Sequence, residues 1–249
     1  MLEMPRSQFQ HGGDIRRLAA RAGVSQDELL DFSANINPLG LPVGFRSLIR
    51  RRLNEILHYP DPRAAGVIAA VSRRYGIPPE EIIVGNGSTE ILYALPRALS
   101  RGRAVIPVPS YADYAVASAL AGMEVVKVAL SEHRGFILEM DELEDHLQGD
   151  EIVFIGRPNN PTGLSCAAVA IRAAARCHPD TVFVIDEAFA DFVPAMDRLL
   201  VRRPPNVIVL CSLTKFHAIP GLRLGFAAGA AAVMEKIGGF ILPWTVNAL

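Results

Sequence analysis

From residue 80 onward, short runs rich in β-branched residues alternate with stretches of helical periodicity. Most of these runs are apolar at nearly every position, which is typical of strands that helices cover on both faces. The alternation predicts an α/β fold with three layers, α/β/α, around a mainly parallel sheet. The expected strands are 81–84, 104–108, 125–130, 151–155, 181–185 and 207–211, and the helices expected between them are 89–99, 111–121, 141–147 and 167–176.

The first 80 residues have a different pattern, with helices expected at 15–22, 45–57 and 64–75. Ser25 and Glu28 have the spacing of a capping box, which marks the start of a helical turn. We therefore expect an N-terminal arm with helices over 1–62 and a large domain over 63–249. The last stretch, 237–249, is apolar and lacks a polar tail, so we also expect that a small C-terminal domain is missing from this chain.

Charge and composition exclude several classes of function. The formal net charge of −1 over 249 residues gives no electrostatic signature for nucleic acid or for an anionic membrane surface. The three cysteines have no Cys-x-x-Cys spacing, so neither a disulfide framework nor a zinc or other metal site is expected. Residues 1–13 are polar, unlike a secretory signal, and every uncharged stretch is shorter than the ~20 residues of a membrane span. We expect a cytoplasmic protein.

Two loops that follow expected strands have sequences typical of phosphate binding or of turns. Both lie at the carboxyl ends of the strands, the edge at which open α/β sheets bind their ligands. Residues 85–90, Gly-Asn-Gly-Ser-Thr-Glu, open a helix, where free N–H groups favour a phosphate, although a plain helix cap explains the same pattern. They are not a dinucleotide fingerprint, because Glu90 replaces the third glycine. Residues 157–163, Arg-Pro-Asn-Asn-Pro-Thr-Gly, form a turn sequence.

Two further loops contain residues suited to catalysis. Asp186 follows an expected strand, where a carboxylate can cap a helix, bind a metal, act as a base or pair with a ring nitrogen. Lys215 follows the next strand, among small hydroxyl residues and near Arg223. An apolar site disfavours the ammonium form of lysine and so favours imine chemistry.

Together these segments resemble a known family. Asn-Pro-Thr-Gly at 160–163, Asp-Glu-Ala-Phe at 186–189 and Ser-Leu-Thr-Lys at 212–215, with a following arginine, resemble the fold-type I pyridoxal-phosphate enzymes of aminotransferase class I/II. The resemblance implies a cofactor, pyridoxal 5′-phosphate, held by Lys215 as an imine. It implies that Asp186 pairs with the pyridine nitrogen and that Asn160 binds the ring hydroxyl. These three are the expected catalytic residues.

The resemblance also assigns the rest of the cofactor site. Tyr111 is expected to stack on the ring, with Tyr114 as the alternative. Tyr59, in the segment Tyr-Pro-Asp-Pro, is expected to reach the phosphate bound by a neighbouring subunit, which implies a homodimer. The residues expected to hold the phosphate within the chain are Gly87, Ser88, Thr89, Ser212 and Arg223.

Within this family, the chain resembles the threonine-phosphate decarboxylases of cobalamin synthesis. The resemblance lies in residues 11–14, His-Gly-Gly-Asp, in residues 31–40, and in Phe189, where histidinol-phosphate aminotransferases usually have tyrosine. It implies decarboxylation of threonine phosphate to (R)-1-amino-2-propanol phosphate, with His11 and Asn35 contacting the phosphorylated substrate. For a lone histidine such as His11, an exposed position in the arm without a substrate contact is the more common explanation. The alternatives are a histidinol-phosphate aminotransferase and a truncated cofactor-binding domain without turnover.

Overall fold

The computed structural model describes residues 12–249 and contains one seven-stranded sheet in the order β1-β7-β6-β5-β4-β2-β3. Strands β3, β2, β4, β5 and β6 pair in parallel, and β7 runs antiparallel to both β6 and β1. The strands are β1 (Ile82–Asn86), β2 (Arg103–Val108), β3 (Glu124–Ala129), β4 (Glu151–Gly156), β5 (Val182–Asp186), β6 (Val207–Ser212) and β7 (Leu224–Ala228). The predicted mainly parallel sheet is confirmed.

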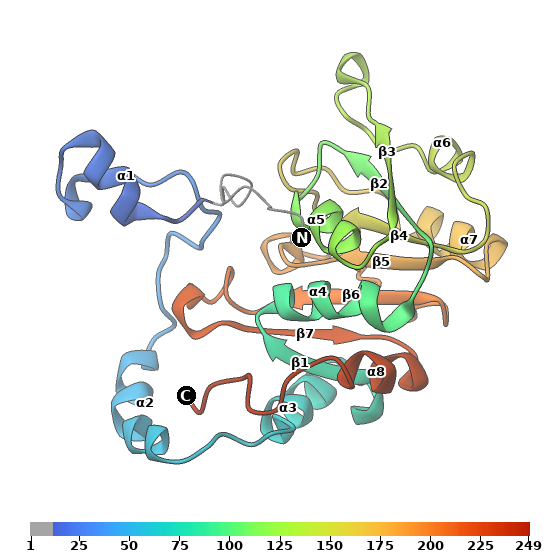
Figure 1. Ribbon diagram of the computed structural model, residues 1–249. Helices are drawn as coiled ribbons and strands as arrows, with labels where there is room; N and C mark the ends of the chain where they lie inside the picture. Colours follow the sequence, from blue (N-terminus) through green and yellow to red (C-terminus); the bar gives the residue numbers. More distant parts are fainter. Residues whose placement is uncertain (1–11) are drawn as a thin grey trace.

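Helices cover both faces of this sheet, which gives the three expected layers (Figure 1). On one face, the apolar sides of α4 (Ser88–Leu99), α5 (Asp113–Leu120) and α8 (Ala231–Gly238) pack against alternate strand residues such as Val184. On the other face, α3 (Ala65–Tyr75), α6 (Met140–Glu144) and α7 (Ala168–Cys177) pack against the residues between them, such as Ile185. Period-two alternation therefore gives each strand two buried faces.

The sequence did not predict β7. Its sequence, Leu-Gly-Phe-Ala-Ala, has no β-branched residue, and it continues without a charge towards α8. Gly225 is required by close packing, since a Cβ atom there would lie 2.2 Å from the backbone nitrogen of Ser88. The strand is held by its pairing between β1 and β6, which are far apart in sequence.

The N-terminal arm begins with α1 (Ile15–Ala22), which stands away from the sheet in Figure 1. The expected capping box of Ser25 is present at η2 (Gln26–Glu28). The helix expected at 45–57 is divided into α2 (Phe45–Arg52) and η3 (Leu53–Leu57). The remaining short helices are η4 (Pro79–Glu81), η5 (Glu132–Arg134), η6 (Ala190–Phe192) and η7 (Pro220–Leu222). The division into domains at residues 62 and 63 stays a prediction.

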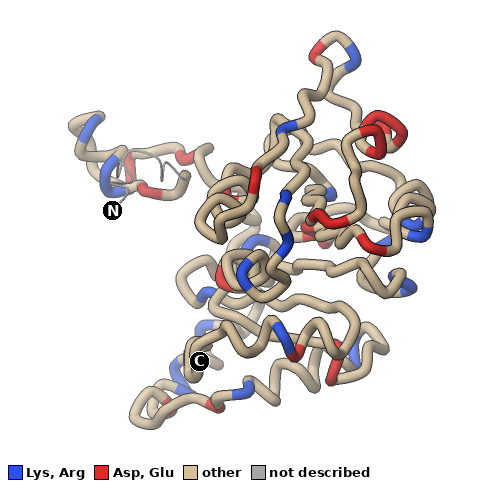
Figure 2. Tube along the Cα trace, turned by 45° about the vertical axis from the view of Figure 1, so that its right-hand side comes forward, with Lys and Arg blue, Asp and Glu red and all other residues tan. Residues whose placement is uncertain are grey.

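Charged residues of both signs are interspersed along most of the chain, and α6 is a local acidic exception (Figure 2). Within residues 12–249, no helix combines the length and the apolar character needed to cross a bilayer. The same residues contain no group of three or more His, Cys, Asp or Glu side chains placed to hold a metal ion.

Candidate active site

Asp186 is the last residue of β5, and its side chain faces α4 and α5. Its Oδ2 accepts a hydrogen bond of 2.9 Å from the Tyr114 hydroxyl, and its Oδ1 accepts one of 2.9 Å from the Ala188 N–H. Burial raises the pKa of Asp186, and these two hydrogen bonds and the positive charge of Lys215 oppose that shift only in part. A further positive charge next to Asp186 would therefore stabilise the charged form of this carboxylate.

Lys215 lies three residues beyond the end of β6, the neighbour of β5. Its Nζ donates to the Thr214 Oγ1 at 3.2 Å, and that oxygen shares a 2.8 Å hydrogen bond with the Ser212 Oγ. Desolvation lowers the pKa of Lys215, and the Arg223 charge lowers it further, while Asp186 acts in the opposite direction. A lowered pKa increases the neutral fraction of the amine, which is the nucleophilic form.

The Arg223 side chain lies against the turn that precedes α4. Gly87 has a positive φ of 77° and precedes the first helical residue, Ser88. A Cβ atom at Gly87 would lie 2.5 Å from the Arg223 Nη2, so glycine is needed for the guanidinium to lie against this turn. Free N–H groups at a helix start and a neighbouring guanidinium both favour a phosphate. Four of the five residues expected from the sequence to hold one, Gly87, Ser88, Thr89 and Arg223, belong to this arrangement, whereas the Ser212 hydroxyl is hydrogen-bonded to Thr214.

The two tyrosines expected near the ring have different surroundings. The Tyr111 ring is partly exposed; burial raises its pKa, as does its hydrogen bond to Asp113, whereas a hydrogen bond with Thr89 lowers it. Tyr114 is 2% exposed and stacks on Phe154 with 5.3 Å between ring centroids. Tyr114 thus holds the Asp186 carboxylate through its hydroxyl. Tyr111 stays the candidate for stacking on the cofactor ring.

A cavity of about 310 Å³ brings together residues from the arm and from two loops. Asn35 of the arm, Asn160 of the loop after β4, and Phe189 of the loop after β5 all line it. The arm is held there by Asn37, whose N–H donates to the Lys215 carbonyl at 3.1 Å and whose Nδ2 donates to the Phe216 carbonyl at 2.8 Å. Asn35 therefore lies in the same region as the candidate catalytic residues.

Several supporting residues were not predicted from the sequence. Asn37 lay inside the segment 31–40 that carried the resemblance, but its contact with the Lys215 turn joins residues far apart in the chain. Asn159 donates through its Nδ2 to the Pro109 carbonyl and to the Thr162 Oγ1, both at 2.9 Å. It thereby ties the loop after β2 to the loop after β4. The Asn-Asn doublet was the only sequence signal for it.

Among the described site residues, Tyr59 is not brought to this group. Tyr59 is 83% exposed, and its ring lies 5.2 Å from that of Trp244, next to a separate cavity of about 640 Å³ lined by α2 and the C-terminal segment. Its expected role in a neighbouring subunit stays a prediction. His11 lies outside the described residues.

Comparisons with known proteins show which proteins this chain resembles. The chain is 40% identical over 244 residues to the threonine-phosphate decarboxylase of Salmonella typhimurium, covering 96% of this chain and 67% of the relative. It is 34% identical to the adenosylcobalamin biosynthesis bifunctional protein CobDQ of Leptospira interrogans, again over 96% of this chain but over 28% of that protein. The crystal structure of the histidinol-phosphate aminotransferase from Clostridium acetobutylicum superposes with a TM-score of 0.79 and 28% identity, covering 88% of this chain and 66% of that one.

The chain therefore spans two thirds or less of the length of most of these proteins. A profile of the family described as aminotransferase class I and II matches residues 27–249. Because this profile covers most of the chain, the chain belongs to the aminotransferase class I and II family, whose cofactor is pyridoxal 5′-phosphate.

Proposed function

We propose that the protein is a threonine-phosphate decarboxylase that forms (R)-1-amino-2-propanol phosphate and carbon dioxide for cobalamin biosynthesis. The observation that carries the proposal is the placement of Lys215 and Asp186 at the ends of adjacent strands, with Arg223 beside the amine. The identity of 40% to the Salmonella typhimurium decarboxylase supports this reaction class.

The described residues fit the cofactor by their chemistry. Pyridoxal 5′-phosphate has an aldehyde, a ring nitrogen and a phosphate, and the site offers a desolvated amine, a desolvated carboxylate and an arginine at a helix start. When bound, the cofactor supplies an electron sink for the electron pair left at the substrate Cα.

Each residue then has a separate task. Lys215 would bind the aldehyde carbon, and Asp186 would hold a proton on the ring nitrogen, which would offset the cost of burying the carboxylate charge. Arg223, Ser212 and the turn at 87–89 would bind the phosphate, and Asn160 the ring hydroxyl. Tyr111 would cover the ring, and its partial exposure leaves a face for this contact.

We favour decarboxylation over amino transfer because of the residues that line the cavity beside Asn160. The bond broken at Cα is the one held perpendicular to the ring, so substrate orientation decides the reaction. Asn35 lines the cavity beside Asn160, and Phe189 gives this cavity an apolar wall without a hydroxyl. Asn35, with His11, would orient the phosphorylated substrate. The similarity to the Clostridium acetobutylicum aminotransferase keeps histidinol phosphate as the second candidate substrate.

We further propose a cytoplasmic homodimer. Tyr59 and the apolar residues before it in η3, Ile56 and Leu57, are exposed by 83%, 58% and 75%. Exposed apolar residues next to one another are typical of a protein interface. A second copy placed over this surface would bring Tyr59 to the partner's phosphate. Sedimentation analysis should give twice the mass of the chain; a monomer with full cofactor affinity would contradict this proposal.

The direct test is a pair of assays on the purified chain loaded with pyridoxal 5′-phosphate. We expect carbon dioxide release from threonine phosphate and no amino transfer from histidinol phosphate. Amino transfer alone would favour the aminotransferase. Cofactor binding without either reaction would favour a cofactor-binding domain without turnover. Lys215→Ala is the control, because it should lose both the activity and the visible absorbance of the lysine-bound cofactor.

A further inference from the structure

A second buried polar cluster lies directly behind the candidate site, on the other face of the sheet. Side chains alternate along a strand, so Asp186 follows Val184 onto the face covered by α4, whereas Glu187 follows Ile185 onto the face covered by α7. Glu187 is 1% exposed. The proposed function gives no role to this buried carboxylate.

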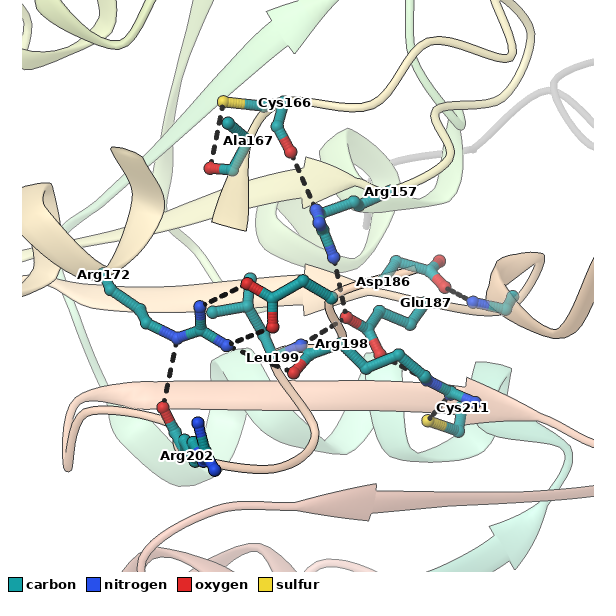
Figure 3. A network of polar contacts seen from close by, with 12 residues as sticks. Arg157, Cys166, Ala167, Arg172, Asp186, Glu187, Arg198, Leu199, Arg202 and Cys211 are labelled. Atoms are coloured by element: carbon teal, nitrogen blue, oxygen red, sulfur yellow. Dashed lines mark hydrogen bonds and ion pairs between the residues drawn. The ribbon is translucent and has the colours of Figure 1, made fainter. Parts of the chain in front are cut away.

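Glu187 accepts hydrogen bonds from three donors, which lie on two segments far apart in the chain (Figure 3). Its Oε1 accepts from the Arg157 Nη1 at 3.2 Å and from the Leu199 N–H at 2.8 Å, and its Oε2 accepts from the Arg198 Nε at 2.9 Å. Two guanidinium groups therefore share one carboxylate. Charge-assisted hydrogen bonds of this kind have narrow geometry, so they fix the segments that carry them.

The two arginines extend the cluster to three strand ends. The Arg157 Nε donates to the Cys166 carbonyl at 2.8 Å, across the loop that contains Asn160. The Arg198 Nη1 donates to Asp191 at 2.8 Å, and its Nη2 contacts the Cys211 Sγ at 3.3 Å on β6. The cluster thus connects the carboxyl ends of β4, β5 and β6.

These are the same strand ends that carry the proposed cofactor residues. Arg157 precedes Asn160 in its loop, Glu187 follows Asp186, and Cys211 precedes Ser212. The Arg157 N–H also donates to the Asp186 carbonyl at 2.8 Å, so a backbone hydrogen bond joins the buried polar cluster to the candidate site. The Glu187 charge additionally raises the pKa of Asp186.

We propose that Glu187 is a positioning residue: by clamping Arg157 and Arg198 it fixes the carboxyl ends of β4, β5 and β6 relative to one another. It thereby sets the places of Asn160 and Asp186 on the opposite face. A buried ion pair adds little net stability compared with apolar packing, so geometric specificity is its main contribution here. The consequence for the cofactor rests on the proposed function.

The same sheet provides a matched control at its other edge. Glu151, at the start of β4, is also buried (0% exposed). It accepts hydrogen bonds from the N–H groups of Gln148 and Gly149 at 2.9 and 3.0 Å and from the Thr181 hydroxyl. Glu151→Gln removes a buried carboxylate of the same type from the edge opposite to the site.

The experiment compares Glu187→Gln with Glu151→Gln in the full chain. The first measurement is the Kd for pyridoxal 5′-phosphate, from absorbance after equilibrium dialysis. We expect Glu187→Gln to raise this Kd about tenfold and Glu151→Gln to change it by less than about twofold, since Glu187 contacts the loops of the site and Glu151 does not. An unchanged Kd in Glu187→Gln, or equal changes in both variants, would overturn the proposal.

The second measurement is amide hydrogen exchange without cofactor, which separates this inference from the proposed function. Glu187→Gln should speed exchange at the amides of Ala188 and Arg157, which donate to Asp186, whereas Glu151→Gln should leave them protected. If the wild type fails to bind the cofactor, the proposed function is wrong, and this measurement alone decides whether Glu187 positions the loops.

A second variant covers the case in which Glu187→Gln does not fold. Arg157→Lys keeps the positive charge but loses the fork that joins Glu187 to the Cys166 carbonyl. It should raise the Kd about threefold and speed exchange at the Ala188 amide. Wild-type values for both quantities in Arg157→Lys would overturn the proposal.

Discussion

The two edges of the central sheet each hold a desolvated carboxylate, Glu151 at the amino edge and Asp186 at the carboxyl edge, and the pKa values of the two acids shift in opposite directions. At the amino edge, burial alone would raise the pKa of Glu151, but hydrogen bonds from Thr181, Gln148 and Gly149 lower it overall. At the carboxyl edge, burial raises the pKa of Asp186 beyond what Ala188 and Tyr114 can offset. The protein itself therefore stabilises the charged form of Glu151. The charged form of Asp186 is left to be stabilised by a further positive charge, which is typical of a functional site.

The largest difference between the edges should appear when Lys215 is removed. Lys215→Ala should lower decarboxylase activity by at least about 10³-fold, because it removes the desolvated amine that would bind the aldehyde. The melting temperature of this variant should stay close to that of the wild type, because the substitution removes a desolvated amine and buries no new polar group. Lys127→Ala, on β3, is the control and should keep its activity.

Asp186→Asn sharpens the comparison with Glu151→Gln. The first should lower kcat/KM about 10²-fold, with little loss of stability, whereas the second should cost about 1–3 kcal/mol of unfolding free energy with activity retained. Denaturant unfolding and steady-state kinetics on both variants provide the measurement. Comparable kinetic losses in the two variants would remove the distinction between the edges.

The pH dependence of stability should also differ in sign. The folded pKa of Asp186 is raised, so its contribution favours the folded state at low pH and is lost as the pH rises through that pKa. The folded pKa of Glu151 is lowered, so its contribution is present above the unfolded pKa and is lost as the pH falls through the folded pKa. Unfolding of Asp186→Asn and Glu151→Gln across the acid range, without cofactor, would show these opposite trends relative to the wild type.

Two glycines, one at each edge of the sheet, allow a steric test of the same comparison, with a smaller expected effect. A Cβ atom at Gly225 would lie 2.2 Å from the Ser88 nitrogen, whereas one at Gly102, before β2 at the amino edge, would meet nothing within 4 Å. Gly225→Ala should displace the start of α4 and raise the cofactor Kd about tenfold. Gly102→Ala should leave the Kd unchanged; equal Kd values for the two variants would contradict the assignment of the phosphate site.

The smallest expected effect comes from Tyr114→Phe, which keeps the ring stacked on Phe154 and removes only the hydroxyl. The hydrogen bond from Tyr114 lowers the pKa of Asp186, so its loss should raise that pKa. Activity should fall about threefold to tenfold, and any acidic limb of the pH–rate profile should move to higher pH. A limb that moves to lower pH would show that the hydroxyl does not support the ionised carboxylate.

Local patterns predicted most of the fold, because a buried strand needs only a short apolar, β-branched run. They missed β7, whose Gly225 and alanines carry no such signal and which is positioned by its neighbours. The three main site residues, Lys215, Asp186 and Asn160, were assigned through the resemblance to a family, and their roles stay predictions. The contact of Tyr114 with Asp186 spans 72 residues, and that of Arg157 with Glu187 spans 30. Contacts of this range depend on how strands are ordered in the sheet, which no local pattern encodes.

The most direct test of the central claim is to trap the cofactor on the chain and to identify its lysine. The sequence contains only three lysines, Lys127, Lys215 and Lys236, so the result is unambiguous. Pyridoxal 5′-phosphate is added, the product is reduced with borohydride, and the modified peptide is identified by mass spectrometry. The account predicts stoichiometric modification of Lys215 alone. Modification of Lys127 or Lys236 instead, or of no lysine, would contradict it.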